Sequence, residues 1–444
     1  MRNQALQSAI DTVLNTQSPT MSVVSLEFLS ASNPTFSFSP LLINELVIEQ
    51  KFFDSSDEVG GAYADVITTT FDIASADYAK LYDIQQDLKV ILTIQACDKN
   101  GLVVPKSPAT KTAFKAMIMN ARDLRKELTD VQYRTTPDTT MTVQLVEDAL
   151  YTLRLKPINV IYRAMTMSQV IRHVAASLSI TKISLIAPDS DSNTFDQVHI
   201  PPYKDFGNVF EFLQKRYGVY MCGCNHYYTS GVLYVYAPYD TSAKTTTSLS
   251  LYQAEQGYHA GASSFHALTA SGDWQIVTNE APHMHDLSTA SAENHGTSKM
   301  FLRSSNIVDG IVTTNSAGLS EFADSSAVSI GLKTSTPLSG TTKNNQYTKT
   351  TDNMFEAASE LVAHHAIIAQ CVWHNAIPFA INPGMAVSYF SDESGKILKR
   401  TGLCESVTYG LTQSARTSAG MTMLCVAHLT VRLDPTGSAV TAVS

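Results

Sequence analysis

The stretch from Met421 to Leu433 places the strongest constraint on the fold, because apolar residues occupy every second position in it without a break. These residues are Met421, Met423, Cys425, Ala427, Leu429, Val431 and Leu433. Successive side chains of a β-strand point to opposite faces, so a period of two predicts one long strand with a single buried face. Residues 87–96 alternate in the same way. The sequence therefore predicts a mainly β fold.

Length and charge limit the class of protein. At 444 residues the chain is too long for one core, so several domains are expected. Charged residues make up 16%, against roughly 25% in a typical soluble chain. The net charge of −9 argues against a dedicated DNA-binding protein, which carries a basic excess. Residues 1–15 lack the apolar core of a signal peptide, and no apolar run reaches the roughly 18 residues of a membrane span. We therefore expect a chain made in the cytoplasm without a membrane anchor.

Residues 1–160 are predicted to form an N-terminal helix and a first β-barrel with a helical insertion at 107–129. Ser107-Pro108 is a typical helix start, and apolar residues from Phe114 to Leu128 suggest one helical face. Strand patterns cover 22–29, 41–48, 65–73, 87–96, 140–146 and 151–155.

Residues 161–240 are predicted to form a small α+β domain. A helix follows Thr166, and a strand covers 182–186. Pro201-Pro202 suggests a turn before a helix at 205–216. A hairpin through Thr229-Ser230-Gly231 then completes the domain.

The rest of the chain divides into a loop-rich part and a second barrel. Residues 241–350 are rich in Ser, Thr, Gly and Asn, which predicts extended loops with short strands that contribute to the second barrel. Residues 351–444 are predicted to form that β-barrel, with a leading helix after the cap residue Asn353.

Two residue groups suggest metal binding, and neither is complete. Cys222, Cys224 and His226 would lie on one strand face roughly 6.6–7 Å apart, which is too far for one tetrahedral zinc unless the chain turns tightly. Buried thiols are the simpler interpretation. His283 and His285 resemble the start of a metallohydrolase motif, but Asp286 comes one place too early and no second His follows within the motif.

Other catalytic signatures are missing from the sequence. The segment 189–196 resembles half of a calcium loop without its glycine and final Glu, so a turn is favoured. No nucleophile elbow, phosphate loop or dinucleotide fingerprint is present. We expect no enzyme activity, no catalytic or metal residues, and no cofactor.

Three local patterns resemble the central hub proteins of phage tail baseplates. They are IPPYKDFGNVFEFLQKRYGVY (200–220) with its hairpin ending LYVYAP (233–238), the segment 352–376 leading into INPGMAVSYF (381–390), and TGLCESVTYG (401–410) before the long final strand. The order of barrel, small α+β domain, loop-rich connection and second barrel is also similar, and the patterns span about half the chain. The hub part of type VI secretion spike proteins shares this fold.

The resemblance implies a structural virion protein with two tail-tube-like barrels flanking the α+β domain. It implies a homotrimer that ends the tail tube, adapts sixfold to threefold symmetry, seats the spike and forms part of the DNA ejection channel. The implied partners are the tail tube protein, the spike or tip protein, the tape-measure protein and other baseplate proteins, with non-specific passage of DNA. No spike repeat or lysozyme-type domain follows the second barrel in this sequence.

Two other functions stay open at this stage. One is a tail-associated, metal-dependent cell-wall hydrolase that uses His283, His285 or the group at 222–226. The other is a receptor- or carbohydrate-binding tail protein, although both tryptophans, Trp274 and Trp373, lie in strand-like runs.

Overall fold

The computed structural model describes most of the chain. The described ranges are 3–16, 21–51, 65–74, 77, 88–98, 101–103, 110–118, 138–237, 248–254, 265–278, 283–286, 312–314, 320–322, 367–433 and 437–441, without residues 31, 32, 34, 193, 205, 221, 222, 230, 418 and 419. The fold is mainly β, and a large mixed sheet of 16 strands dominates it. The predicted helix after Asn353 lies outside the described residues.

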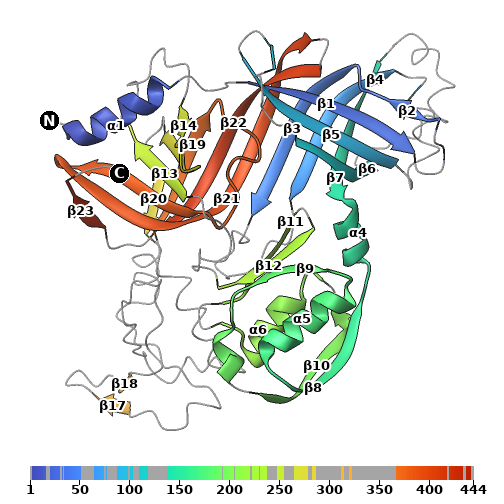
Figure 1. The fold of residues 1–444 in the computed structure, drawn as a ribbon, viewed down its shortest axis with the longest axis vertical. Helices are drawn as coiled ribbons and strands as arrows, with labels where there is room; N and C mark the ends of the chain where they lie inside the picture. The colour runs from blue at the N-terminus through green and yellow to red at the C-terminus, as the bar shows by residue number, and fades with distance from the viewer. Residues whose placement is uncertain are drawn as a thin grey trace.

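The first group of strands, which we call the N-terminal strand unit, comes from the start of the chain (Figure 1). Its strands are β1 (Met21–Ser30), β2 (Ser37–Phe38), β3 (Leu42–Lys51), β4 (Val66–Ala74), β5 (Leu88–Cys97), β6 (Thr110–Ile118) and β7 (Asp138–Glu147). All its pairings are antiparallel. Burial alternates along most of these strands, so one face forms the core and the other remains partly exposed.

The second group, the C-terminal strand unit, contains the later strands of the same sheet. They are β13 (Ser248–Gln253), β14 (His266–Leu268), β15 (Trp274–Thr278), β16 (His283–Asp286), β19 (Ile367–His374), β20 (Ala386–Glu393), β21 (Lys396–Thr417), β22 (Gly420–Leu433) and β23 (Ser438–Val440). Strand β13 runs parallel to both β15 and β20, which makes the sheet mixed. The predicted long strand at 421–433 is confirmed as β22, and the segment 401–410 before it lies within the single strand β21.

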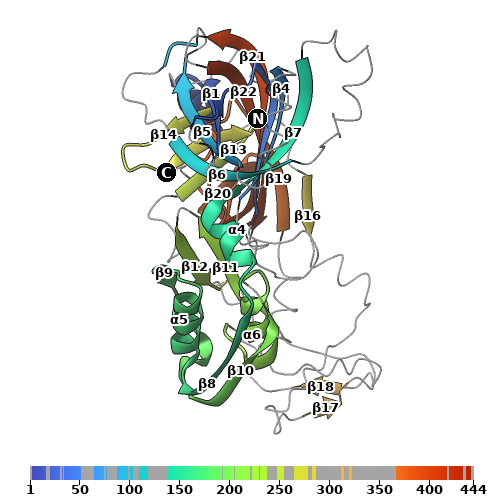
Figure 2. The same ribbon diagram turned by 90° about the vertical axis from the view of Figure 1, so that its right-hand side faces the viewer.

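Between the two strand units the chain forms an α+β unit, which lies below them in Figures 1 and 2. Its elements are α4 (Asp148–Arg154), β8 (Ile158–Met165), α5 (Met167–Ser177), β9 (Lys182–Leu185), the short helix η2 (Asp189–Ser192), β10 (Phe195–Lys204), α6 (Val209–Tyr217), β11 (Asn225–Thr229) and β12 (Val232–Tyr236). The predicted hairpin through residue 230 is confirmed. The helix after Thr166 is also confirmed, since the Thr166 hydroxyl and the Gln169 side chain form a capping box. A separate hairpin joins β17 (Val312–Thr314) and β18 (Ser320–Phe322).

The first helix, α1 (Gln4–Leu14), contacts strands from the other end of the chain. Its buried residues Leu6, Ile10 and Val13 belong to an apolar cluster with Tyr252, Ala254, Ala267, Val277, Phe390 and Ile397. The Asn3 side chain caps the helix, and the backbone N–H of Asn3 donates a hydrogen bond to the Asp392 carboxylate at 2.6 Å. Helix α1 thus packs on the C-terminal strand unit.

The predicted helix at 107–129 is wrong for 110–118, where the structure has strand β6. Phe114 and Ala116 are buried while Ala113 and Met117 are exposed, which is the alternation of a strand. β6 pairs with β5 on one side and β7 on the other, and this pairing outweighs the local helical pattern. Residues 107–109 and 119–129 lie outside the described part.

Two smaller predictions also need correction. The expected strand at 151–155 is mostly helix α4, in which Leu150 and Leu153 are buried one turn apart. The expected turn at Pro201-Pro202 lies within strand β10, beside a register shift between Ile200 and Lys204. Proline lacks a backbone N–H donor, so a strand accepts it at an edge or a bulge such as this one.

Candidate functional site

The hairpin of β21 and β22 is shared by both strand units. On β21, residues 396–403 pair with β20 and residues 406–412 pair with β3. On β22, residues 426–433 pair with β19 and residues 421–423 pair with β1. The last strands of the chain therefore complete a sheet that the first strands begin.

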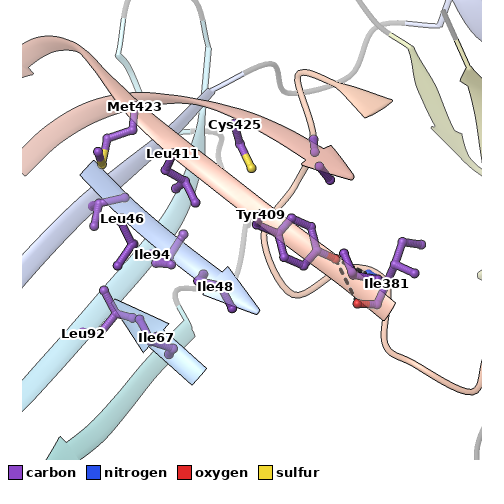
Figure 3. Close-up of a cluster of buried hydrophobic side chains, with 14 of the residues drawn as sticks. Leu46, Ile48, Ile67, Leu92, Ile94, Ile381, Tyr409, Leu411, Met423 and Cys425 are labelled. Carbon is purple, nitrogen blue, oxygen red and sulfur yellow. Dashed lines mark hydrogen bonds between the residues drawn. The ribbon is translucent and has the colours of Figure 1, made fainter. Parts of the chain in front are cut away.

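The antiparallel pairings of the N-terminal strand unit return to their starting point through this hairpin. The order is β21, β3, β4, β7, β6, β5, β1, β22 and again β21. Apolar side chains from both ends of the chain meet inside this circuit, as Figure 3 shows. Those drawn include Leu46, Ile48, Ile67, Leu92, Ile94, Leu411, Met423 and Cys425, all nearly or fully buried.

A buried tyrosine anchors the hairpin to the loop before β20. The Tyr409 hydroxyl donates to the backbone carbonyl of Ile381 at 2.9 Å and accepts from the Ile381 backbone N–H at 2.9 Å (Figure 3). Burial raises the pKa of Tyr409 well above its usual value, so the hydroxyl keeps its proton. This anchor fixes the loop against the shared hairpin.

In the C-terminal strand unit, β14 and β19 are connected by a side-chain hydrogen bond. No backbone pairing between these two strands is present in the described residues. β14 and β16 form the two ends of the main strand order. The indole N–H of Trp373 on β19 donates to Nδ1 of His266 on β14 at 3.2 Å, and Trp274 lies 6.1 Å from Trp373 between ring centroids. Burial lowers the pKa of His266 to about 4, so the imidazole is neutral near pH 7 and its Nδ1 can accept this hydrogen bond.

A buried ion pair lies inside the shared hairpin. Nε of Arg432 on β22 lies 3.1 Å from Oε2 of Glu405 on β21, and both side chains are 7% exposed. Burial raises the pKa of Glu405, and the Arg432 guanidinium opposes this shift. The sequence prediction missed the pair, because Arg432 falls on the polar side of the alternating pattern. Glu405, a charged residue between the apolar residues Cys404 and Val407, was the one sequence feature that could have indicated a buried charge.

The α+β unit meets the sheet through a polar contact. Tyr227 on β11 donates its hydroxyl proton to Asp65, just before β4, and accepts a hydrogen bond from Gln50 of β3 at 3.4 Å. Burial and then the Asp65 charge raise the pKa of Tyr227 well above its usual value. The Tyr227 hydroxyl therefore keeps its proton near pH 7 and can donate it to Asp65.

The structure places Cys224 and His226 in the core of the α+β unit, and Cys222 lies outside the described residues. Both described side chains are at most 3% exposed. The His226 ring packs against Phe206 and Phe210, with centroid distances of 5.7 and 4.8 Å. Burial lowers the pKa of His226 to about 3. Within the described residues no three His, Cys, Asp or Glu side chains gather as a metal site.

The other two candidate segments are also placed. His283 and His285 lie on β16, opposite Gln370 and Ile368 of β19. The segment from Asp189 forms the short helix η2, which confirms the expected turn. Asp191 accepts hydrogen bonds from the Ser168 backbone, at 2.8 Å, and from the Ser168 hydroxyl. It thereby caps helix α5, where a negative charge is favourable.

The described cysteines are poor nucleophiles. Cys97, Cys224, Cys371, Cys404 and Cys425 are all free and buried. Burial raises the pKa of Cys371 to about 12, and burial together with Asp98 raises that of Cys97 to about 11. These side chains pack as small apolar groups. In the described part of the chain, no helix is long and apolar enough to cross a membrane.

No protein-family model and no curated protein matches the chain. Solved structures that resemble it include the prophage MuSo2 43 kDa tail protein from Shewanella oneidensis, with a TM-score of 0.45, 12% identity, and coverage of 92% of this chain and 96% of that one. A tail protein from Neisseria meningitidis MC58 has a TM-score of 0.43, 9% identity, and coverage of 92% and 96%. A chain of the Francisella PdpA–VgrG complex has a TM-score of 0.41 and 8% identity, and this chain spans about half of its length (96% and 55%).

Two of these neighbours are tail proteins, one of them from a prophage, and the third is a chain of a PdpA–VgrG complex. All three TM-scores lie below 0.5, so the likeness alone assigns no function to this chain.

Proposed function

We propose that this chain is the subunit of a trimeric baseplate hub in a phage tail, with a structural and non-enzymatic role. It ends the tail tube, adapts sixfold to threefold symmetry, seats a spike or tip protein and forms part of the channel through which DNA leaves. Its further partners are the tail tube protein, the tape-measure protein and other baseplate proteins. Its location is the virion, and its two strand units are the two tail-tube-like barrels.

One observation carries this proposal: a single chain holds two β units side by side, joined by one shared hairpin. Three copies around an axis then present six β units, which is what an adaptor between sixfold and threefold partners needs. The backbone ladders through β21 and β22 hold the two units in one fixed relation. A flexible linker would leave that relation undefined.

The position of the α+β unit supports the same arrangement. It lies below both strand units (Figures 1 and 2) and is tied to the sheet by α4 and by the Tyr227 contact with Asp65. We propose that it packs on the outside of the assembled ring.

The test is the assembly of the purified chain. Light scattering at micromolar concentration should give three times the chain mass of 48.3 kDa, and electron-microscope class averages should show a ring with a central opening. A stable monomer would overturn the proposal. Stoichiometric bound zinc, together with cell-wall release that is lost in His285→Ala, would instead support the hydrolase.

A further inference from the structure

Strand β21 changes its partner at one residue. Leu403 pairs with Ala386 of β20, and the backbone of Cys404 still bonds to Gly384 and Met385, at 2.7 and 2.9 Å. Ser406 already pairs with Lys51 of β3. Glu405 is therefore the residue at which β21 passes from the C-terminal to the N-terminal strand unit.

Glu405 is also the extra residue of a β-bulge. Opposite β22, Cys404 pairs with Val431 and Ser406 pairs with Thr430, which leaves Glu405 without an opposite residue in the ladder. A bulge bends its strand and increases the local twist. The bend between the two strand units thus lies where the partner changes.

The Glu405 side chain is held by Arg432 at this bend. The two groups are 3.1 Å apart, and each is 7% exposed. A buried ion pair contributes little net stability, because the cost of removing both charges from water offsets their attraction. Its hydrogen bond nevertheless has a defined length and direction, so the pair favours one geometry of the bulge.

A glycine permits close approach of the strands beside the pair. Gly402 lies opposite Leu433, and a Cβ atom on Gly402 would lie 2.0 Å from the carbonyl oxygen of Arg432. Any larger residue would push β22 away from β21 at this point. By contrast, the nearest atom to a Cβ on Gly410 of the same strand would be 3.8 Å away.

We propose that Glu405 and Arg432 are positioning residues that set the angle between the two strand units. In the hub this angle decides whether copies close into a ring, and that second statement rests on the proposed function. The first statement concerns the single chain and stands without it.

The experiment measures a distance across the junction in the full-length chain. Spin labels are placed at Lys89→Cys and Leu268→Cys, two exposed sites on different strand units, in a Cys222→Ser background. Labelled chains are diluted into unlabelled chains, so that each distance lies within one molecule. The double variant Glu405→Met/Arg432→Met fills the site with apolar groups of similar length and avoids an unpaired buried charge.

We expect the double variant to fold, with a distance that is displaced or broadened. Loss of the bulge moves the register by one residue, or about 3.3 Å. The control is Glu393→Met/Arg400→Met, which removes a 2.9 Å ion pair away from the junction and should leave the distance unchanged.

The outcomes are separable. An unchanged distance in the folded Glu405→Met/Arg432→Met variant would overturn the positioning role, whatever its oligomeric state. If that variant does not fold, Glu405→Leu/Arg432→Leu provides the second test: it also removes both charges and the hydrogen bond between them, and a wild-type distance there would likewise reject the proposal. A displaced distance in a chain whose wild type is monomeric would support the angle and refute only the hub.

Discussion

The two strand units share a hairpin but close in different ways. In the N-terminal strand unit, backbone ladders connect every neighbouring pair around the circuit of β3, β4, β7, β6, β5 and β1 with the hairpin. In the C-terminal strand unit, β14 and β19 meet through His266 and Trp373. The first 160 residues contain no histidine, whereas the second unit depends on a buried one.

Because of this difference, we expect core substitutions and acid to affect the stability of the two units differently. Backbone ladders do not titrate, so the N-terminal strand unit should respond mainly to changes in its core. The hydrogen bond between Trp373 and His266 needs a neutral imidazole nitrogen, so the C-terminal strand unit should also respond to acid. Substitutions in the shared hairpin should cause the largest loss of stability, because both units pair with it.

The largest effect is expected from Leu429→Asp on β22. Leu429 is 1% exposed in the core next to Cys371 and Val407, and a carboxylate there has no ionic partner in the described core. The loss should exceed about 4 kcal/mol and abolish soluble expression. Thr430→Asp, on the partly exposed face, should remain soluble. Normal folding of Leu429→Asp would show that β22 is not part of either core.

A smaller but clear loss is expected from Gly402→Ala. The new Cβ would overlap the Arg432 carbonyl, so the two strands must separate at a cost of about 1–3 kcal/mol. Gly410→Ala is the matched control, because its site has room. Urea unfolding of both variants measures the difference, and equal stability would contradict the close approach at the junction.

Acid should lower the stability of the C-terminal strand unit, in which the buried His266 accepts a hydrogen bond from Trp373. The folded state keeps His266 neutral down to a pKa of about 4, while the unfolded chain takes up a proton below about 6.5, so stability falls as the pH drops through this window. At about pH 5 the loss is about 2 kcal/mol for this histidine.

The measurement compares urea unfolding at neutral pH and about pH 5. His266→Gln keeps a hydrogen-bond acceptor for Trp373 but does not titrate, so it should lose less stability on acidification than the wild type. Because His226 still titrates in both proteins, the difference between them isolates His266. Identical acid sensitivity would remove the contrast between the two units.

The smallest effect is expected on the outer face of the N-terminal strand unit. Thr142 and Thr70 share a hydrogen bond of 3.2 Å between partly exposed hydroxyl groups. Thr142→Val should change stability by less than about 0.5 kcal/mol, because water replaces the bond. Val143→Thr, one residue along in the buried face, should cost about 1–3 kcal/mol. Equal effects would mean that the two faces were assigned wrongly.

Strong local patterns predicted their elements correctly. The alternation at 421–433 became β22, and the helix predicted after Thr166 is α5. The sequence favoured buried thiols at Cys222 and Cys224, and the structure buries Cys224 in an apolar core. Where the pattern was ambiguous, as at 110–118, pairing with β5 and β7 decided the element instead.

Along segments with an unbroken pattern, such as 421–433, the sequence by itself determined which residues face a core, because the period of two along a strand depends only on local geometry. The tertiary structure alone decided which core each segment joins. Nothing in the local pattern of β21 reveals that its first part pairs with β20 and its later part with β3, since any partner of matching polarity satisfies a strand edge. The Glu405–Arg432 pair, too, exists only because two segments of suitable register meet at a bulge.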